Sequence, residues 1–220
     1  LEILTKIMAT PTPLDEALSK RVTAGLLRMG TALRSHAWEG AAMAGLTPTQ
    51  GEILTLLLMR GVPMRLGEIA EDAALTSATV SEAVSTLESK GLVEKRRDAN
   101  DGRALALRLT ARGKTAAKKA SQWPNFLTSA SDSLGEKECA QLYRTLVKLI
   151  FTMQERNDMP PQRMCLTCSH FEVSARGKGQ YHCNHFNATY DDSRLPLDCN
   201  AHEEADIATQ RKVWKLYSKA

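Results

Sequence analysis

The feature that most restricts the fold of this 220-residue chain is a pair of strand-like segments directly behind a short helical segment. The helix is predicted over residues 77–90, and Gly91 can end it because glycine readily adopts the left-handed conformation at a helix C-terminus. Residues 92–97 and 104–109 are strand-like, and the turn-rich residues 98–102 separate them. This order predicts an antiparallel hairpin that follows the helix without a linker.

Apolar residues at helical spacing predict further helices on both sides of this unit. Thr47 and Pro48 supply an N-cap and a first helical position for one of them, and Thr76 or Ser77 can cap the helix before the hairpin. The chain is therefore predicted to be mainly α, with a helix-turn-helix and a β wing. The other predicted helices cover residues 14–38, 48–60, 65–73, 110–134 with a local interruption allowed at Pro124, 136–156 and 203–218.

Positive charge is concentrated in and after the hairpin. Residues 90–119 contain ten Lys or Arg and three acidic residues, a net charge of +7, whereas the whole chain carries +4. Like charges crowded into one small element cost stability unless a polyanion neutralises them. A solvated surface ribbon would carry the same charges, but their concentration favours contact with nucleic acid. The hairpin arginines are Arg96, Arg97, Arg103 and Arg108.

The helix over residues 77–90 has two different faces. Val80, Val84 and Leu87 form a narrow apolar stripe, and the opposite surface carries small or polar side chains. Such a surface lets a helix backbone approach another molecule closely, as insertion into the DNA major groove requires. A solvated helix face would look the same, and the basic hairpin behind it shifts the balance toward DNA. The surface residues are Ala78, Ser81, Glu82, Ser85 and Ser89.

Five segments in this order resemble the multiple-antibiotic-resistance regulator (MarR) family: residues 46–50 (LTPTQ), 66–70 (LGEIA), 77–81 (SATVS), 87–95 (LESKGLVEK) and 101–113 (DGRALALRLTARG). The resemblance covers roughly residues 14–156. It implies an obligate homodimer of winged helix-turn-helix subunits with long dimerisation helices. Such dimers bind a pseudo-palindromic operator in double-stranded DNA, usually as repressors that a small molecule or oxidation releases.

The resemblance also assigns roles to individual residues. Residues 77–90 would be the recognition helix, with Ser77, Thr79, Ser81, Glu82 and Ser85 as candidate groove contacts. The wing residues Arg96, Arg97 and Arg103 would meet the minor groove or the DNA backbone. Asp101 would pair with Arg103, although Asp101 also suits a turn on its own. The first and the last two helices of this region would form the dimer interface. A separate option is a regulator that also binds a small aromatic effector between these helices, near His36 and Trp38.

Cysteine and histidine are concentrated beyond this region. Four of the five cysteines and four of the five histidines lie between positions 165 and 202, and Met159-Pro160-Pro161 marks a boundary. We therefore expect two domains, residues 1–158 and a small, irregular, metal-bound module over residues 159–220 with a terminal helix. The fifth cysteine, Cys139, is predicted to be a buried small hydrophobe of helix 136–156 rather than a redox sensor.

The module is predicted to bind a metal through Cys165, Cys168, Cys183 and Cys199. In a reducing compartment clustered cysteines favour metal ligation over disulfides, and a segment with few large aliphatic residues needs the added stability. One CxxC pair and two single cysteines suit a [4Fe-4S] cluster, and the spacing is similar to that of high-potential iron–sulfur modules. Zinc is the alternative, with His182 or His185 in place of a thiolate. A metal-free thiol switch is the third possibility for the four cysteines. His170 and His202 suit positions that support the site or lie on the surface.

These features predict a sequence-specific transcriptional regulator, in which the cluster senses redox state, iron or nitric oxide. A regulator with structural zinc and a small aromatic effector is the first alternative, and an electron-transfer metalloprotein is the second. We expect no enzyme, because the chain has no Gly-rich phosphate loop, nucleophile elbow or HExxH motif. No apolar run approaches the ~18 residues of a membrane span, so a cytoplasmic protein is expected.

Overall fold

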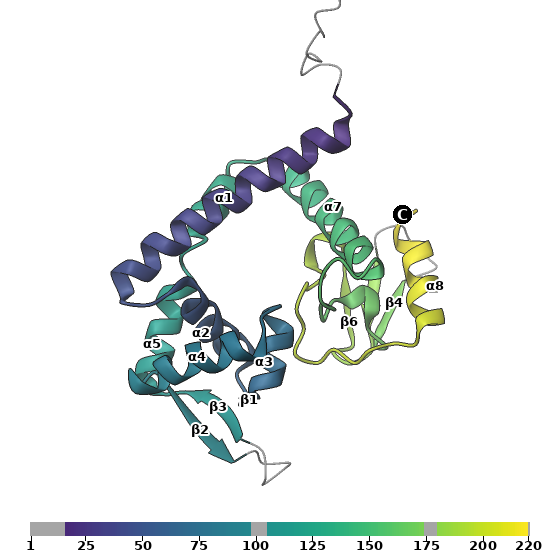
Figure 1. The fold of residues 1–220 in the computed structure, drawn as a ribbon. Coiled ribbons are helices and arrows are strands. Elements are labelled where there is room, and N and C mark those ends of the chain that lie inside the picture. The colour runs from purple at the N-terminus through teal and green to yellow at the C-terminus, as the bar shows by residue number, and fades with distance from the viewer. Residues whose placement is uncertain (1–15, 98–104, 174–179, 220) are drawn as a thin grey trace, which may run out of the picture. The chain divides into compact units, whose positions relative to one another are not determined.

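The computed structural model describes residues 16–97, 105–173 and 180–219 (Figure 1). It divides the chain into two compact units, Leu1–Pro48 and Thr49–Ala220. The boundary that the sequence predicts between residues 158 and 159 lies inside the second unit and stays a prediction. Each unit is described by itself below.

The first unit contains a single long helix among its described residues, α1 (Leu18–Ala44). It ends at Gly45, which has a φ of 62° and donates from its backbone N–H to carbonyl oxygens of the last turn. The helix runs past the predicted end at residue 38, because the alanine-rich residues 41–44 have high helix propensity. Its exposed large apolar side chains are Leu18, Val22, Leu27, Met29, Trp38 and Met43.

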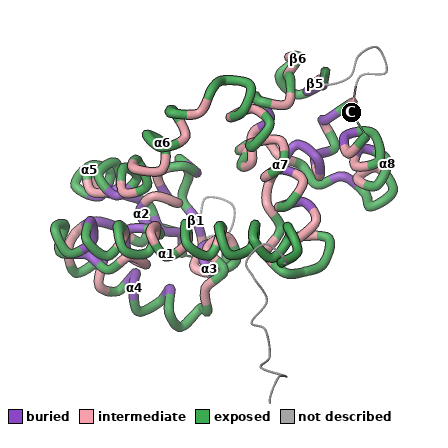
Figure 2. The backbone as a smooth tube through the Cα atoms, turned by 90° about the horizontal axis from the view of Figure 1, so that it is seen from above, coloured by how far each residue is buried: buried purple, intermediate pink, exposed green. Residues whose placement is uncertain are grey.

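The second unit begins with the predicted helix-turn-helix. It consists of α2 (Pro48–Arg60), α3 (Leu66–Asp72) and α4 (Ser77–Ser89). The Thr76 hydroxyl accepts a hydrogen bond from the Thr79 N–H at 3.2 Å, which confirms Thr76 as the cap of α4. Gly91 has a φ of 67° after the end of α4, as predicted. Ile69, Val80, Val84 and Leu87 are fully or almost fully buried, whereas most of α4 is exposed (Figure 2).

The hairpin forms as predicted and gains a third strand. Strands β2 (Val93–Arg97) and β3 (Leu105–Leu109) are antiparallel, with Val93 opposite Leu109 and Arg97 opposite Leu105. The short strand β1 (Met64–Arg65) pairs with the other edge of β3, which gives the order β1-β3-β2. The sequence did not predict β1, because two residues are too few to show a strand period. The wing tip, residues 98–104, lies outside the described residues.

Three helices follow the sheet: α5 (Ala111–Ala120), α6 (Asn125–Asp132) and α7 (Glu136–Glu155). The expected interruption of helix 110–134 is real, because Pro124 has no N–H to continue the hydrogen-bond ladder and α6 starts directly after it. Cys139 on α7 is half-buried, where burial was expected. Among the described residues, no helix is long and apolar enough to cross a lipid bilayer.

The cysteine-rich module is more regular than the sequence predicts. A short 3-10 helix (Cys165–Thr167) precedes an antiparallel sheet of β4 (Phe171–Val173), β5 (Tyr181–Cys183) and β6 (Ala188–Tyr190). A second 3-10 helix (Asp192–Arg194) and α8 (Ile207–Tyr217) follow. Strands of three residues are too short to show an alternating pattern, so the sequence indicated an irregular segment. The terminal helix begins later than expected because Asp206 caps it through the Thr209 N–H.

The cysteine-bearing segments of the module share their core with α7, which precedes the module, and with α8, the module's terminal helix. Phe171, Tyr181 and Leu195 of the module pack with Val147 and Phe151 of α7 and with Val213 and Tyr217 of α8. The rings of Phe151 and Trp214 stack with centroids 4.4 Å apart. The sequence-based argument that this segment has too few apolar residues is therefore incomplete, because α7 and α8 supply the missing apolar surface.

Gly113 marks the tightest approach in the winged-helix region, and its replacement by alanine should destabilise the fold. A Cβ at this position would lie 1.8 Å from the Leu92 carbonyl oxygen, a backbone atom that cannot rotate away. We expect Gly113→Ala to lower the free energy of unfolding by about 3 kcal/mol, measured by urea denaturation. Gly67→Ala on α3 is the control, because nothing lies within 4 Å of its added Cβ. Equal stabilities of the two variants would contradict the prediction.

Candidate functional site

The predicted groove contacts lie on the exposed surface of α4. Ser77, Ser81 and Ser85 are exposed, and their i, i+4 spacing places them in one line along the helix. Glu82 is exposed beside this line. Thr79 is also exposed but lies about half a turn away from the serines by helical geometry, and its hydroxyl shares a 2.8 Å hydrogen bond with the Thr76 hydroxyl. The structure therefore brings four of the five candidates together, and Thr79 belongs to the N-terminal cap.

The wing carries more internal charge compensation than the sequence argument assumed. Glu94 accepts hydrogen bonds from the guanidinium groups of both Arg108 and Arg96, and Lys95 forms a 2.8 Å ion pair with Glu88 of α4. The Arg108 guanidinium holds the pKa of Glu94 below its usual range. The expectation that only a polyanion could neutralise the charges of the hairpin is therefore wrong, because Glu94 and Glu88 neutralise part of them.

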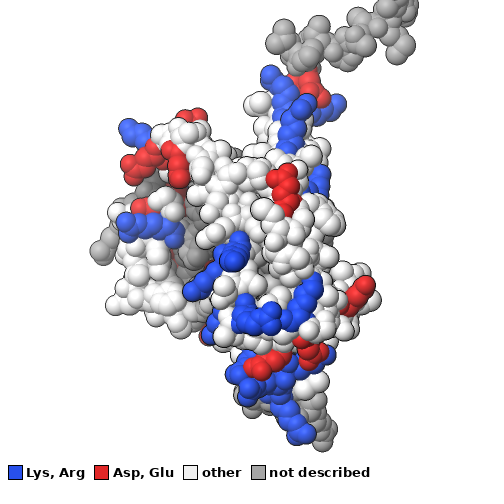
Figure 3. Space-filling view, turned by 90° about the vertical axis from the view of Figure 1, so that its left-hand side faces the viewer, with Lys and Arg blue, Asp and Glu red and all other residues white. Residues whose placement is uncertain are grey.

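Arg97 differs from its neighbours in the wing. It is exposed at the end of β2, and within the described ranges no ion pair involves it. Lys and Arg side chains gather around the hairpin end of the face shown in Figure 3, with some acidic side chains among them. Asp101 and Arg103, which the family resemblance pairs, lie outside the described residues.

The four cysteines of the module come from three segments that meet. The N–H of Cys168 donates to the Cys165 carbonyl at 3.1 Å within one tight turn. Cys183 lies at the end of β5, opposite Phe171 in the sheet register, and the Cys199 N–H donates to the Arg163 carbonyl at 2.9 Å. Cys165, Cys168 and Cys183 are buried, and Cys199 is half-buried.

The four thiols affect the ionisation of groups in and around their site. Burial raises the pKa of Cys165 to about 12, with further contributions from the thiols of Cys168, Cys199 and Cys183. Burial also raises the pKa of Tyr190, and Cys183, Cys165 and Cys199 all add to that shift. Four thiolates could not coexist in such a site without a cation to balance their charge.

A metal fits this site by the chemistry of its donors. Four soft sulfur ligands from a largely buried cluster suit zinc or an iron–sulfur cluster. Across the described ranges, however, no group of three or more His, Cys, Asp or Glu side chains is arranged so that it could already hold a metal ion. The thiols thus converge without forming a completed ligand set, and the metal stays a prediction.

The histidines take different positions around the cysteines. His182 is half-buried between two buried neighbours on β5, so strand alternation places it on the opposite face from Cys183. His185 is exposed and lies edge-on to Phe186 and tilted against His170, at centroid distances of 4.7 and 5.1 Å. His202 shares a 3.0 Å hydrogen bond with the Thr167 hydroxyl in the turn between the first two cysteines. His182 and His185 are thus less suited to be metal ligands than the four thiols, because one lies on the opposite face of β5 and the other is exposed.

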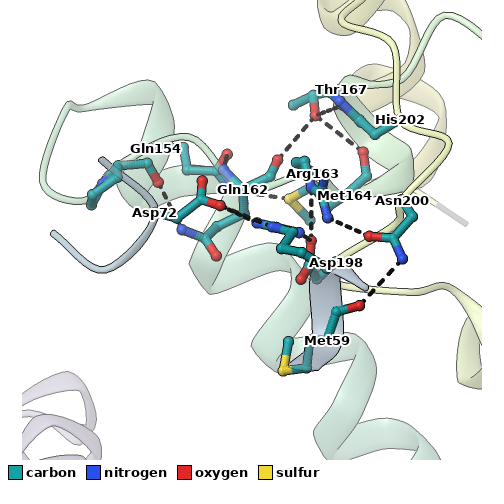
Figure 4. A network of polar contacts seen from close by, with 12 residues as sticks. Met59, Asp72, Gln154, Gln162, Arg163, Met164, Thr167, Asp198, Asn200 and His202 are labelled. Atoms are coloured by element: carbon teal, nitrogen blue, oxygen red, sulfur yellow. Dashed lines mark hydrogen bonds and ion pairs between the residues drawn. The ribbon is translucent and has the colours of Figure 1, made fainter. Parts of the chain in front are cut away.

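A polar network that the sequence did not indicate joins the helix-turn-helix to the module (Figure 4). Arg60, the last residue of α2, has a side chain only 8% exposed and forms ion pairs with Asp72 at 2.6 Å and Asp198 at 2.5 Å. Burial opposes the charged form of Arg60, but the hydrogen bonds to Asp198 and Asp72 outweigh it and raise its pKa. Asp198 precedes Cys199, and 138 positions separate it from Arg60, so no local pattern could reveal the pair.

Comparison with known proteins agrees with this fold. Residues 46–105 match the model of the MarR family. CouR from Rhodococcus jostii RHA1, solved with p-coumaroyl-CoA, has a TM-score of 0.53 and 20% identity, over 62% of this chain and 96% of its own. NadR, solved with 4-hydroxyphenylacetate, has a TM-score of 0.50 and 24% identity, over 63% of this chain and 96% of its own. MepR from S. aureus, solved with DNA, has a TM-score of 0.50 and 25% identity, over 59% of this chain and 96% of its own. No curated protein matches the sequence.

The structure is a mainly helical winged helix-turn-helix with small antiparallel sheets, and its residues 46–105 are similar to the MarR family. The family match ends at residue 105, before α5 to α8 and the cysteine-rich module. The role of the module must therefore be argued from its own residues.

Proposed function

We propose that this protein is a MarR-type transcriptional regulator that binds a pseudo-palindromic operator in double-stranded DNA as a homodimer and acts as a repressor. One observation carries the proposal. The exposed line of Ser77, Ser81 and Ser85 on α4 lies next to a basic hairpin, in a fold similar to that of MepR, which has been solved with DNA. Small side chains allow α4 to approach base edges in the major groove, and the hairpin supplies cations for phosphates.

The dimer accounts for apolar side chains that the monomer leaves exposed. Leu142 and Leu149 of α7 are 44% and 37% exposed, and α1 exposes its own apolar residues. Dimerisation through these helices would cover them and set the distance between two recognition helices. Trp38, 62% exposed on α1, together with His36 remains the proposed place for a small aromatic effector.

Selection of bound sequences from random double-stranded DNA tests this function. Because two-fold symmetric dimers present two recognition helices, we expect two inverted half-sites with centres roughly 10 base pairs apart. Affinity should fall steeply with salt, since phosphate contacts release counterions. Binding without sequence preference, or a selected sequence without dyad symmetry, would contradict the proposal.

Arg97 should contribute to DNA affinity but not to sequence preference. We expect Arg97→Ala to weaken binding uniformly across operator variants and to reduce the slope of log affinity against log salt by about 1, as loss of one phosphate contact predicts. Fluorescence anisotropy over a salt series measures both. Arg194→Ala removes the same charge from an exposed position in the module and is the control. An unchanged salt slope in Arg97→Ala would show that Arg97 does not touch the backbone.

We further propose that Cys165, Cys168, Cys183 and Cys199 bind a [4Fe-4S] cluster, which would make DNA binding respond to redox state, iron or nitric oxide. The buried, converging thiols support this assignment. Zinc on the same four residues, or with a histidine replacing one of them, is the alternative. Anaerobic purification with iron, sulfide and zinc analysis and a visible spectrum decides between them. One equivalent of zinc in a colourless protein would overturn the cluster, and absence of both metals would leave a thiol switch.

A further inference from the structure

Arg60 ties together three segments that are far apart in the sequence. It ends α2, Asp72 ends α3, and Asp198 lies in the module immediately before Cys199. The Arg60 Nε donates to the Asp72 carboxylate at 2.9 Å, while Nη1 donates to Asp198 at 2.5 Å. We call these three residues the Arg60 clasp. The guanidinium thus connects the two helices that precede the recognition helix to the loop that carries Cys199.

The clasp is sensitive to the position of Asp198. The side chain of Arg60 is only 8% exposed, so little solvent reaches it to compensate for a lost carboxylate partner. Loss of one member of a buried charge pair leaves an uncompensated charge, which costs far more than an exposed pair contributes. If Asp198 moves, Arg60 must therefore also move or draw in water, and either change disturbs the ends of α2 and α3.

The cysteine-bearing segments in turn hold Asp198. The Arg163 Nε donates to Asp198 at 2.9 Å, and Arg163 stands two residues before Cys165. The Arg163 carbonyl accepts the Cys199 N–H at 2.9 Å. Arg163 thus contacts both Asp198 and Cys199, and it lies two residues before Cys165. It therefore connects the segment of the first cysteine to the segment of the last one, which carries Asp198. The position of Asp198 is thus held by contacts between these two segments.

The contact between the module and the helix-turn-helix is polar around the clasp. The Asn200 side chain donates to the Met59 carbonyl at 3.3 Å, beside the Arg60 ion pairs. A cavity of about 510 Å³, lined by residues of α3, α7 and the module, adjoins the clasp. The contacts described around the clasp are hydrogen bonds and ion pairs, so the charged contact can carry the coupling between the helix-turn-helix and the module.

We propose that the Arg60 clasp is a coupling contact through which the folded state of the cysteine module positions α2 and α3 of the helix-turn-helix. Arg60 acts as a positioning residue, because its described hydrogen bonds go to Asp72 and Asp198 and not to the serines of α4 or to the thiols. The consequence for DNA affinity rests on the proposed function. The coupling itself does not, since it can be measured without DNA.

Hydrogen exchange on the full-length protein tests the coupling. The module is disrupted by Cys165→Ser combined with Phe171→Ala, which removes a thiol and a ring that is 3% exposed in the core. In the otherwise unchanged protein, we expect this disruption to speed exchange in residues 49–76 by tenfold or more. In an Asp198→Asn background, the same disruption should change it by less than threefold. Asp158→Asn, an exposed aspartate outside the clasp, is the matched control and should behave as the unchanged protein.

Arg60→Gln breaks the same contact from the helix-turn-helix side and decides the test if Asp198→Asn itself deprotects residues 181–190. The clasp is supported if the module of Arg60→Gln is protected from exchange and its disruption then changes exchange in residues 49–76 by less than threefold. The proposal is overturned if disruption of the module leaves residues 49–76 unchanged, or speeds their exchange equally with and without the clasp. Operator binding is measured in parallel: coupling without any operator preference would count against the proposed function and leave the clasp standing.

Discussion

Removal of the proposed metal is expected to unfold residues 164–205 while α2 to α6 stay folded. The three cysteine-bearing segments are held by two 3-10 turns and three strands of three residues each. Such short elements contribute little stability of their own, and structural metal sites in small domains contribute on the order of 10 kcal/mol through ligand binding. Burial raises the pKa of Cys165 to about 12, so without the proposed metal its thiol would be neutral at pH 7 and would not hold the segments together through metal ligation.

Chelation, or the double variant Cys165→Ser/Cys168→Ser, provides the measurement. Hydrogen exchange in residues 181–195 should accelerate by at least 100-fold, and the first thermal transition should fall by 10 °C or more, on the order of several kcal/mol. Cys139→Ser is the control, because Cys139 is half-buried on α7 and belongs to none of the three segments. Full protection of residues 181–195 after complete metal removal would show that the aromatic core shared with α7 and α8 stabilises the module alone.

That shared core gives α7 two roles in one helix. Tyr143, Val147 and Phe151 face the module, and the Tyr143 hydroxyl donates to the Leu195 carbonyl. Leu142 and Leu149 on the same helix remain exposed. If the exposed leucines form part of the dimer interface, a change in the module reaches that interface through α7 and the helix-turn-helix through Arg60. A single module would then influence both determinants of the spacing between recognition helices.

The sequence predicts the helices well where their ends depend on neighbouring residues. Thr76, Gly91 and Pro124 each act within a few positions of themselves, so caps, stops and breaks could be identified from short segments. The same holds for the exposed serines of α4, whose spacing alone defines a face. The MarR resemblance covered the region that the family model then matched in part.

Features that depend on distant partners could not be predicted in this way. β1 exists only because Met64 and Arg65 meet Leu107 and Ala106 across the sheet. The ion pairs of Arg60 join residues 12 and 138 positions apart, and nothing in the local sequence distinguishes this arginine from an exposed helix-end cation. The module's sheet was missed for the same reason, since its strands are defined by pairing rather than by a hydrophobic period.

A tryptophan in the serine line of α4 should weaken operator binding strongly without harming the fold. Ser85 is exposed, so Ser85→Trp creates no clash inside the protein, and its free energy of unfolding should stay within about 0.5 kcal/mol of the unchanged protein. In the DNA complex the added ring would occupy the space between the helix backbone and the base edges. The major groove is only about 12 Å wide, so the helix would have to withdraw and lose its base contacts.

We expect Ser85→Trp to weaken operator binding by at least 100-fold, about 2.8 kcal/mol, while weak binding to random DNA at low salt persists through the wing. Anisotropy titrations on the selected operator and on a scrambled duplex measure both affinities. Thr189→Trp, which adds the same ring to an exposed strand position of the module, is the matched control and should bind the operator normally. Full operator affinity in Ser85→Trp would contradict the assignment of α4 as the recognition helix, because a helix that contacts base edges through this face cannot accommodate an indole there.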